Sequence, residues 1–298
     1  MTPRVVAVVG PTAAGKSDLA TALAQTLGGE VVNADSMQLY RGMDIGTAKL
    51  PPAERGGVPH HLLDVWDVTV TATAAAYQQL CRTVVDGLLA RGVTTVLVGG
   101  SGLYLRAALD DLQFPGTDPA LRAALEAELA SAGPLALHAR LAALDPQAAA
   151  RMEPLNGRRV VRALEVVTLT GAMPGRMTSY DGYYATSWVG LDRDDLPERI
   201  DQRVDRMWAE GLVEEVRRLE GLGLREGVTA SRALGYGQVL ALLDGAIDEV
   251  AARTQTAVAT RRFARRQRAW FRRDPRISWL EPGPNLLDRA LARIPSTR

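Results

Sequence analysis

The run GPTAAGKS, from Gly10 to Ser17, fits the pattern GxxxxGK followed by Ser or Thr, and it directly follows the apolar run Val5 to Val9. In a loop of this kind the glycines let backbone N–H groups turn toward phosphate oxygens, and the positive end of the next helix faces the same anion. Lys16 adds a point charge, and the hydroxyl of Ser17 is a suitable ligand for Mg²⁺. Leucines at every fourth position from Leu19 to Leu27 predict that the helix follows. The stretch therefore predicts a strand, a phosphate-binding loop and a helix that hold a diphosphate or polyphosphate, without fixing the reaction.

The composition of the 298-residue chain is that of an ordinary globular protein, with 47% hydrophobic and 23% charged residues. This length suits one large domain, or one domain with an insertion. A single cysteine excludes an internal disulfide, and three histidines give no convincing zinc site. The sequence has neither a signal-peptide pattern nor an apolar run long enough to cross a bilayer. We therefore expect a cytoplasmic protein with no membrane partner, most simply a monomer.

Strand and helix patterns alternate along the chain. Glu30 to Ala34 and Thr94 to Val98 have the composition of buried strands, and a predicted helix at 72–91 lies between them. A further strand is predicted at 186–191, followed by an amphipathic helix at 196–219. This order favours an α/β fold with a P-loop NTPase-like core, in which a parallel sheet is flanked by helices.

Asp35 directly follows the second predicted strand, at the sheet edge where open α/β folds bind ligands. Its carboxylate can hold Mg²⁺, accept a proton or cap the next turn, and the residues alone do not separate these roles. The strand ending at Val98 is followed by glycines and not by the acidic residue of nucleotide hydrolases, which counts against an ATPase. Between the two strands, Met43 to Lys49 is predicted to be an ordered loop, and the pair His60 and His61 to be structural.

Residues 115–172 have a different pattern, with Ala-rich and Leu-rich helical segments broken by prolines and no strand candidate. We therefore expect an all-helical insertion domain at 114–185, and a core formed by residues 1–113 and 186–298.

Arginines are concentrated on single faces of predicted helices. In the insertion they are Arg158, Arg159 and Arg162, for which a solvated face is the better interpretation when the cluster is taken alone. In the last long helix, predicted at 248–272, they form a stripe of Arg261, Arg265, Arg268 and Arg272. The stripe indicates a polyanion partner, most simply a nucleic-acid backbone, and the alternative is neutralisation by acidic residues elsewhere in the fold.

These stretches together resemble the tRNA dimethylallyltransferases, also called tRNA isopentenyltransferases. The matching runs are GPTAAGKS at 10–17, NADSMQLYRGMDIGTAK at 33–49, PHHLLDV at 59–65, VGGSGLYLRA at 98–107, RRVVRALEVV at 158–167, RIDQRVDRM at 199–207, RALGYGQ at 232–238 and ATRRFARRQRAWFRR at 259–273. The phosphate loop is shared with many enzymes, whereas DSMQ and GMDIGTAK together with the GGSGLY turn are specific to this family. The resemblance covers nearly the whole chain.

The resemblance implies transfer of the dimethylallyl group from dimethylallyl diphosphate to N6 of adenosine 37, beside the tRNA anticodon, with release of diphosphate and with Mg²⁺ as cofactor. It implies that Asp35 is the general base for the N6 proton and that Ser101 orients the amine by a hydrogen bond. The implied stabilisers of the leaving diphosphate are Lys16 and Arg203. The implied diphosphate-binding residues are Gly10, Pro11, Thr12, Ala13, Ala14, Gly15, Lys16, Ser17 and Arg203, with Ser17 as the metal ligand.

The same resemblance implies a set of tRNA contacts, and it implies that the reacting base leaves its stack. The set is Asp35, Ser36, Met37, Gln38, Ser101, Arg122, Arg158, Arg159, Val160, Val161, Arg162, Arg232, Ala233, Leu234, Gly235, Tyr236 and Gly237. Two positions depart from the family pattern, which more commonly has threonine at 101 and often has a basic residue at 237. The hydroxyl is kept at Ser101, but a tRNA contact from a basic side chain is lost at Gly237.

Three other functions use part of these features. A small-molecule or nucleotide kinase would bind ATP at the same loop and would not need the arginine stripe. An adenylate isopentenyltransferase would accept a free mononucleotide, which offers too little surface for the insertion and the stripe. A non-catalytic RNA-binding module would leave Lys16 and Asp35 without a role.

Overall fold

The structure, a computed structural model, describes residues 4–174 and 179–295. The contacts within it divide the chain into two compact units, residues 1–111 with 181–298 and residues 112–180. The sequence placed the helical insertion at 114–185, so the two divisions differ by a few residues at each junction.

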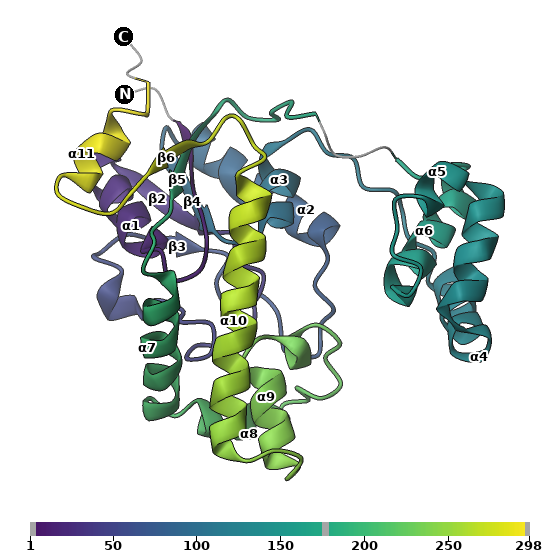
Figure 1. The fold of residues 1–298 in the computed structure, drawn as a ribbon. Helices are drawn as coiled ribbons and strands as arrows, with labels where there is room; N and C mark the ends of the chain where they lie inside the picture. The colour runs from purple at the N-terminus through teal and green to yellow at the C-terminus, as the bar shows by residue number, and fades with distance from the viewer. Residues whose placement is uncertain (1–3, 175–178, 296–298) are drawn as a thin grey trace. The chain divides into compact units, whose positions relative to one another are not determined.

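The first unit contains a six-stranded sheet in the order β3-β2-β4-β1-β5-β6 (Figure 1). Its strands are β1 (Val5–Val9), β2 (Gly29–Asn33), β3 (His60–His61), β4 (Thr94–Gly99), β5 (Thr186–Leu191) and β6 (Ser278–Leu280). Every neighbouring pair is parallel, which confirms the predicted α/β class with a parallel sheet. Val9 lies opposite both Gly99 and Gly190, so the carboxyl ends of β1, β4 and β5 are level with one another.

Helices cover both faces of this sheet (Figure 1). The helices of this unit are α1 (Lys16–Leu27), α2 (Ala74–Ala90), α3 (Gly102–Leu109), α7 (Leu196–Ala209), α8 (Leu212–Glu220), α9 (Tyr236–Leu243), α10 (Glu249–Phe271) and α11 (Leu286–Leu291), with 3₁₀ turns at Pro52–Glu54 and Ala230–Arg232. The single helix predicted at 196–219 is wrong, because α7 and α8 are separate. Gly211 lies between them with φ 97°, a left-handed conformation that ends one helix and begins the next.

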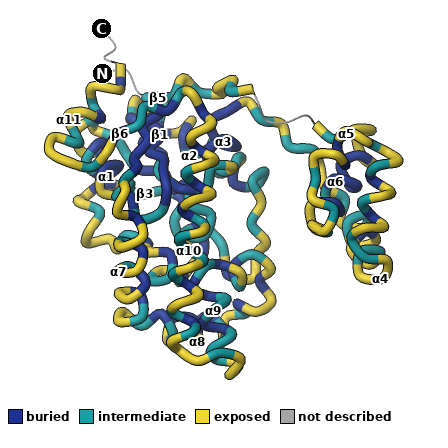
Figure 2. Tube along the Cα trace, in the orientation of Figure 1, coloured by how far each residue is buried: buried dark blue, intermediate teal, exposed yellow. Residues whose placement is uncertain are grey.

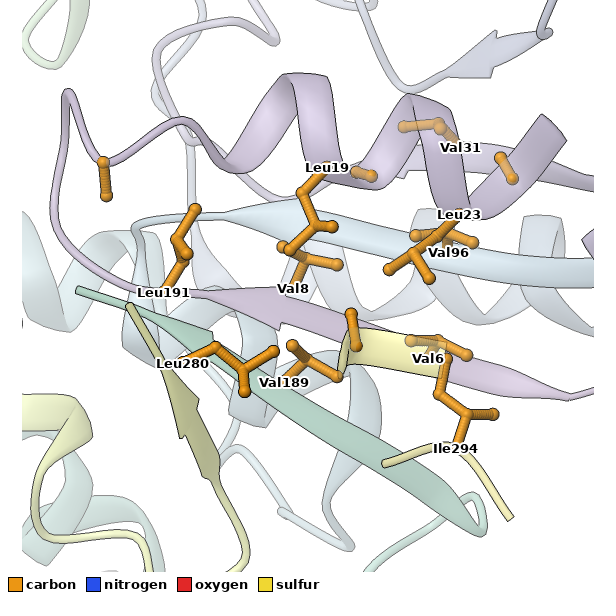
Figure 3. Packing of buried hydrophobic residues seen from close by; sticks show 14 of the residues in the cluster. Val6, Val8, Leu19, Leu23, Val31, Val96, Val189, Leu191, Leu280 and Ile294 are labelled. Atoms are coloured by element: carbon orange, nitrogen blue, oxygen red, sulfur yellow. The ribbon is translucent and has the colours of Figure 1, made fainter. Parts of the chain in front are cut away.

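Alternate residues of the strands enter two apolar clusters, one on each face of the sheet. Val6 and Val8 of β1 pack with α1, α7 and α11, while Val5 and Val9 pack with α2 and α3. Figure 3 shows Leu19 of α1 over the first of these faces. The strands form the continuous buried centre of the unit (Figure 2). Burial on both faces explains why the central strand β1 is wholly apolar.

A third cluster lies at α8 and α9 and holds the segment after β2. Tyr40 and Met43 are fully buried there among Leu212, Val216 and Tyr236. This packing fixes the position of Met43, where the loop at 43–49 begins.

The second unit consists of α4 (Pro119–Leu144), α5 (Pro146–Ala149) and α6 (Gly157–Thr170) around an apolar core. The helix α4 is interrupted at Gly133, which has φ 80° and precedes Pro134. No helix within residues 4–174 and 179–295 is both long and apolar enough to cross a membrane.

Candidate active site

The phosphate loop joins the end of β1 to the start of α1 through backbone with positive φ. Gly10, with φ 138°, lies so close to β5 that a Cβ would stand 2.1 Å from the carbonyl oxygen of Leu191. Glycine is therefore required at this position. The ammonium of Lys16 donates to the carbonyl of Pro11 at 2.7 Å, which folds the lysine back over the loop. The amides, the helix end and the cation can all act on one anion.

Three charged side chains that are far apart in the sequence interact at this loop: Lys16, Asp35 and Arg203. Burial lowers the pKa of Lys16 to about 8 because desolvation disfavours the ammonium; the carboxylate of Asp35 opposes this shift and the guanidinium of Arg203 adds to it. Desolvation also lowers the pKa of Arg203, again opposed by Asp35. Two desolvated cations beside one carboxylate leave an excess of positive charge, which suits a bound diphosphate.

The turn after β2 fixes Asp35 and brings it beside Ser101. The side chain of Asn33 accepts the N–H of Asp35 at 2.9 Å, and Oδ1 of Asp35 accepts the N–H of Met37 at 2.9 Å. The capping role that the sequence left open is therefore present, while Oδ2 of Asp35 accepts no hydrogen bond within the described residues. At the end of the neighbouring strand β4, Oγ of Ser101 accepts the N–H of Ser36 at 3.3 Å. A carboxylate oxygen and a hydroxyl thus lie on adjacent strand ends.

The predicted ordered loop at 43–49 positions Arg203. Glu215 of α8, which is 1% exposed, accepts the N–H groups of residues 44, 45 and 46 at 3.1, 2.8 and 3.2 Å. The loop then presents the carbonyl of Thr47, which accepts from Nη2 of Arg203 at 3.1 Å and from Nε2 of Gln38 at 3.1 Å. The guanidinium is therefore held by a loop that is itself held by a buried carboxylate.

Comparison with known proteins identifies the family. Residues 38–274 match the family model described as IPP transferase. This chain belongs to the IPP transferase family. The tRNA dimethylallyltransferase of Streptomyces coelicolor is 66% identical to it over 284 residues, which cover 94% of this chain and 91% of that protein. The protein of the same name from Thermobifida fusca is 61% identical over 299 residues, covering 97% and 94%. The resemblance predicted from the sequence motifs is confirmed.

Solved structures agree with this assignment. The full-length tRNA isopentenylpyrophosphate transferase from Bacillus halodurans superposes with a TM-score of 0.71 at 39% identity, covering 97% of this chain and 93% of that one. A eukaryotic dimethylallyltransferase, described as acting on tRNA, superposes with a TM-score of 0.82 at 26% identity, covering 97% and 78%. The IPP transferase fold therefore extends over nearly the whole chain.

Two supports of the phosphate loop in this IPP transferase were missed by sequence reasoning. Nε of Arg199 in α7 donates to the carbonyl of Ala13 at 2.9 Å, and Oε1 of Gln267 in α10 accepts the N–H of Thr12 at 2.9 Å. Glu215 was missed as well. The available signal for Gln267 was its place at helical spacing on the buried face of α10, where a polar residue needs a partner.

The arginines predicted to contact tRNA in the helical unit are of two kinds. Arg158 and Arg159 are exposed on α6. Arg122 and Arg162 instead form ion pairs with Glu165, which is fully buried. A buried carboxylate requires such partners, so these two arginines have a structural role whether or not they also meet RNA.

Three of the residues predicted to contact tRNA have buried side chains. Val160 and Val161 lie in the core of the helical unit, and Tyr236 lies in the α8 and α9 cluster with its hydroxyl on Glu215. Apolar periodicity places these side chains in the interior of their units. Arg232, which precedes α9, is exposed and remains a candidate.

The arginine stripe of α10 is largely paired with acidic residues, as the alternative interpretation predicted. Arg268 and Arg272 pair with Asp192 at 2.8 and 3.0 Å, and Arg261 pairs with an aspartate of α7. Arg265 is exposed, with no acidic partner among residues 4–174 and 179–295. A polyanion can therefore meet only part of this stripe without displacing ion pairs of the fold.

Proposed function

We propose that this IPP transferase moves the dimethylallyl group of dimethylallyl diphosphate to N6 of adenosine 37 in the tRNA anticodon loop, giving N6-isopentenyladenosine and diphosphate. The observation that carries the proposal is the meeting of Lys16, Asp35 and Arg203 at the phosphate loop. Family membership supports it, since the relatives described above are named for this transfer.

The cations of the site act on the leaving group. As the carbon–oxygen bond of the substrate breaks, its electron pair stays on the diphosphate, and negative charge increases there. Lys16, Arg203 and the loop amides then bind the transition state more strongly than the ground state, which accelerates ionisation. The planar fork of Arg203 suits the paired oxygens of a diphosphate.

The acceptor side needs a base, because the exocyclic amine of adenine is a weak nucleophile until it loses a proton. Asp35 can take that proton on Oδ2 while Oδ1 stays bound to the N–H of Met37. The hydroxyl of Ser101, on the adjacent strand end, orients the amine. The adenine reaches these groups only after leaving its stack in the anticodon loop.

Mg²⁺ fits the donor set of the loop. This ion is commonly held by one or two protein ligands together with substrate phosphates and water, so it requires no cluster of carboxylates. Ser17 is exposed at the start of α1, and its hydroxyl would hold the ion there. The bound ion would supply further positive charge to the leaving diphosphate.

For the tRNA, we propose contacts from Ser36, Met37 and Gln38 and from the exposed arginines Arg158, Arg159 and Arg232. The enzyme acts on tRNA in the cytoplasm as a monomer.

The direct test is incubation of the purified protein with unmodified tRNA, dimethylallyl diphosphate and Mg²⁺, followed by mass analysis of the nucleosides. We expect adenosine to gain one dimethylallyl group, and a tRNA with guanosine at position 37 to stay unmodified. AMP offered as the acceptor should give no product. Modification of AMP, or competition by ATP far stronger than that by diphosphate, would contradict the proposal.

A further inference from the structure

Gln267 spans the space between the phosphate loop and the end of β4. It lies on the inward face of α10 and is 5% exposed. Its Oε1 accepts the N–H of Thr12 at 2.9 Å, and its Nε2 donates to the carbonyl of Gly100 at 2.9 Å. One side chain thus joins the loop that follows β1 to the residue that precedes Ser101.

The chemistry of these two partners suits an amide. Thr12 offers a donor and Gly100 an acceptor, and a carboxamide is the side chain that meets both with one planar group. A glutamate of the same length would face the Gly100 carbonyl with a second acceptor, and a methionine would leave both backbone groups without a partner.

The backbone directly after β4 leaves room for this amide. A Cβ on Gly100 would stand 2.1 Å from Nε2 of Gln267, so any side chain at that position would displace the amide. Two residues therefore fit each other here, the polar residue of α10 and the glycine that directly follows β4.

The neighbouring residue anchors α10 at the same level. Arg268 donates to Oδ1 of Asp192 at 2.8 Å and to the carbonyl of Arg193 at 2.7 Å, directly after β5. Two successive residues of α10 therefore contact the carboxyl ends of three neighbouring strands, β1, β4 and β5. Figure 1 shows α10 continuing from this level toward α8 and α9 as one long helix. The position of Gln267 is consequently fixed relative to the sheet.

We propose that Gln267 is a positioning residue that sets the distance between the departing diphosphate and the acceptor amine. This inference rests on the proposed transfer reaction. The leaving group lies on the loop that contains Thr12, whereas the amine is oriented from Ser101, and Gln267 ties these two segments together. Its loss lets the segments separate, so that the activated prenyl carbon meets water in place of the amine. Misplacement by about 1 Å lowers such rates by up to about 100-fold.

The test is the ratio of isopentenyladenosine formed to diphosphate released. In the side reaction water attacks the prenyl carbon, the carbon–oxygen bond to diphosphate breaks, and a proton goes to solvent, which leaves dimethylallyl alcohol. For Gln267→Met we expect the ratio to fall about tenfold, within the range for misplaced reactants, with a smaller change in KM for dimethylallyl diphosphate. Gln255→Met, at an exposed position of the same helix, is the matched control and should keep the wild-type ratio.

A second set of variants tests whether Gly100 and Gln267 act through their contact with each other. Gly100→Ala should displace the amide and lower the same ratio, but it should add little in a Gln267→Ala background, because the contact is already gone. If Gln267→Met fails to fold, as judged by its unfolding transition, Gly100→Ala and Gln267→Glu are measured by the same ratio.

An unchanged ratio in the folded variants, or a parallel fall of transfer and diphosphate release, would overturn the inference. So would additive effects of the two substitutions. A wild-type protein that modifies no tRNA contradicts the proposed function itself, and the inference with it, so the two failures are distinguishable.

Discussion

Replacing Glu215 tests whether a buried carboxylate holds the loop that positions Arg203. Oε2 of Glu215 accepts the N–H groups of Asp44 at 3.1 Å and Ile45 at 2.8 Å. Oε1 accepts the N–H of Gly46 at 3.2 Å and the hydroxyl of Tyr236 at 2.6 Å. These four donors have a single acceptor residue in common, so its removal affects all of them together.

The expected loss of stability follows from the donors left without an acceptor. An unsatisfied buried donor destabilises the fold by about 1–3 kcal/mol. In Glu215→Leu the tyrosine hydroxyl can turn away and the loop can admit water, so we expect a total loss of about 3–5 kcal/mol, as for other broken buried charge networks. In Glu215→Gln the amide oxygen keeps two N–H partners and its NH₂ can donate to the tyrosine hydroxyl. One N–H then stays unpaired, for a loss of about 1–3 kcal/mol.

The assay is urea unfolding followed by circular dichroism, together with hydrogen exchange of the amides at 44–46. The matched controls are Glu214→Leu and Glu214→Gln, because the Glu214 side chain is 69% exposed and pairs only weakly with Arg217 at 3.5 Å. We expect the controls to stay within about 0.5 kcal/mol of wild type. Both Glu215 variants should also bind diphosphate more weakly in calorimetry, since Arg203 is held by this loop. The reasoning would be refuted if Glu215→Leu had the same urea midpoint of unfolding, and the same hydrogen-exchange rates at 44–46, as Glu214→Leu.

Four further outcomes can be measured. Asp35→Asn keeps the acceptor for the N–H of Met37 but loses the base, so the rate of transfer should fall about 10²- to 10⁴-fold. Binding of tRNA in a filter assay should be retained. A variant with wild-type turnover would show that Asp35 is not the base. Diphosphate binding should weaken as the pH rises through about 8, the lowered pKa of Lys16, because the ammonium of the empty site then loses its proton. Calorimetry should show this weakening for the wild type and not for Lys16→Gln. Neutralising the exposed Arg262 and Arg265 together should make tRNA binding less sensitive to salt. The slope of the logarithm of the binding constant against the logarithm of the salt concentration should become shallower by about 0.7–0.9 per lost phosphate contact. An unchanged slope would show that the RNA binds elsewhere. Burial raises the pKa of Cys81 to about 12, so a thiol reagent should react with it only after unfolding.

Elements of ordinary length were predictable because their periodicity is local. Strands β1 and β5 have the predicted bounds, and α10 lies within one residue of its predicted ends. The two-residue β3 and the three-residue β6 were missed, since a strand so short has no detectable period. They form because the edges of β2 and β5 offer open hydrogen-bonding groups, and those edges exist only in the folded sheet.

The same distinction separates the parts of the site. The phosphate loop is contiguous, and its residue types carry their chemistry wherever they occur. Gln267 and Glu215 instead contact backbone groups 255 and 170 residues away, at Thr12 and Ile45. Sequence periodicity marks such residues only as polar groups on an apolar face, because tertiary packing selects the partner. The assignments of Asp35 and Arg203 came from the family resemblance, and their roles stay predictions until the variants are measured.

The arginine-rich helix α10 shows why charge density alone does not locate an RNA-binding surface. The side chain of Asp192 is 8% exposed, and a carboxylate so far from water requires cationic partners. Arg268 and Arg272 supply that charge and anchor α10 beside the end of β5. Transferring either arginine to an RNA phosphate would leave the carboxylate poorly neutralised, so the gain in binding would be offset by a loss in the fold. We therefore expect any contact of this helix with RNA to come from exposed arginines outside these ion pairs, such as Arg262, Arg265 and Arg266, which can be neutralised without disturbing a buried group.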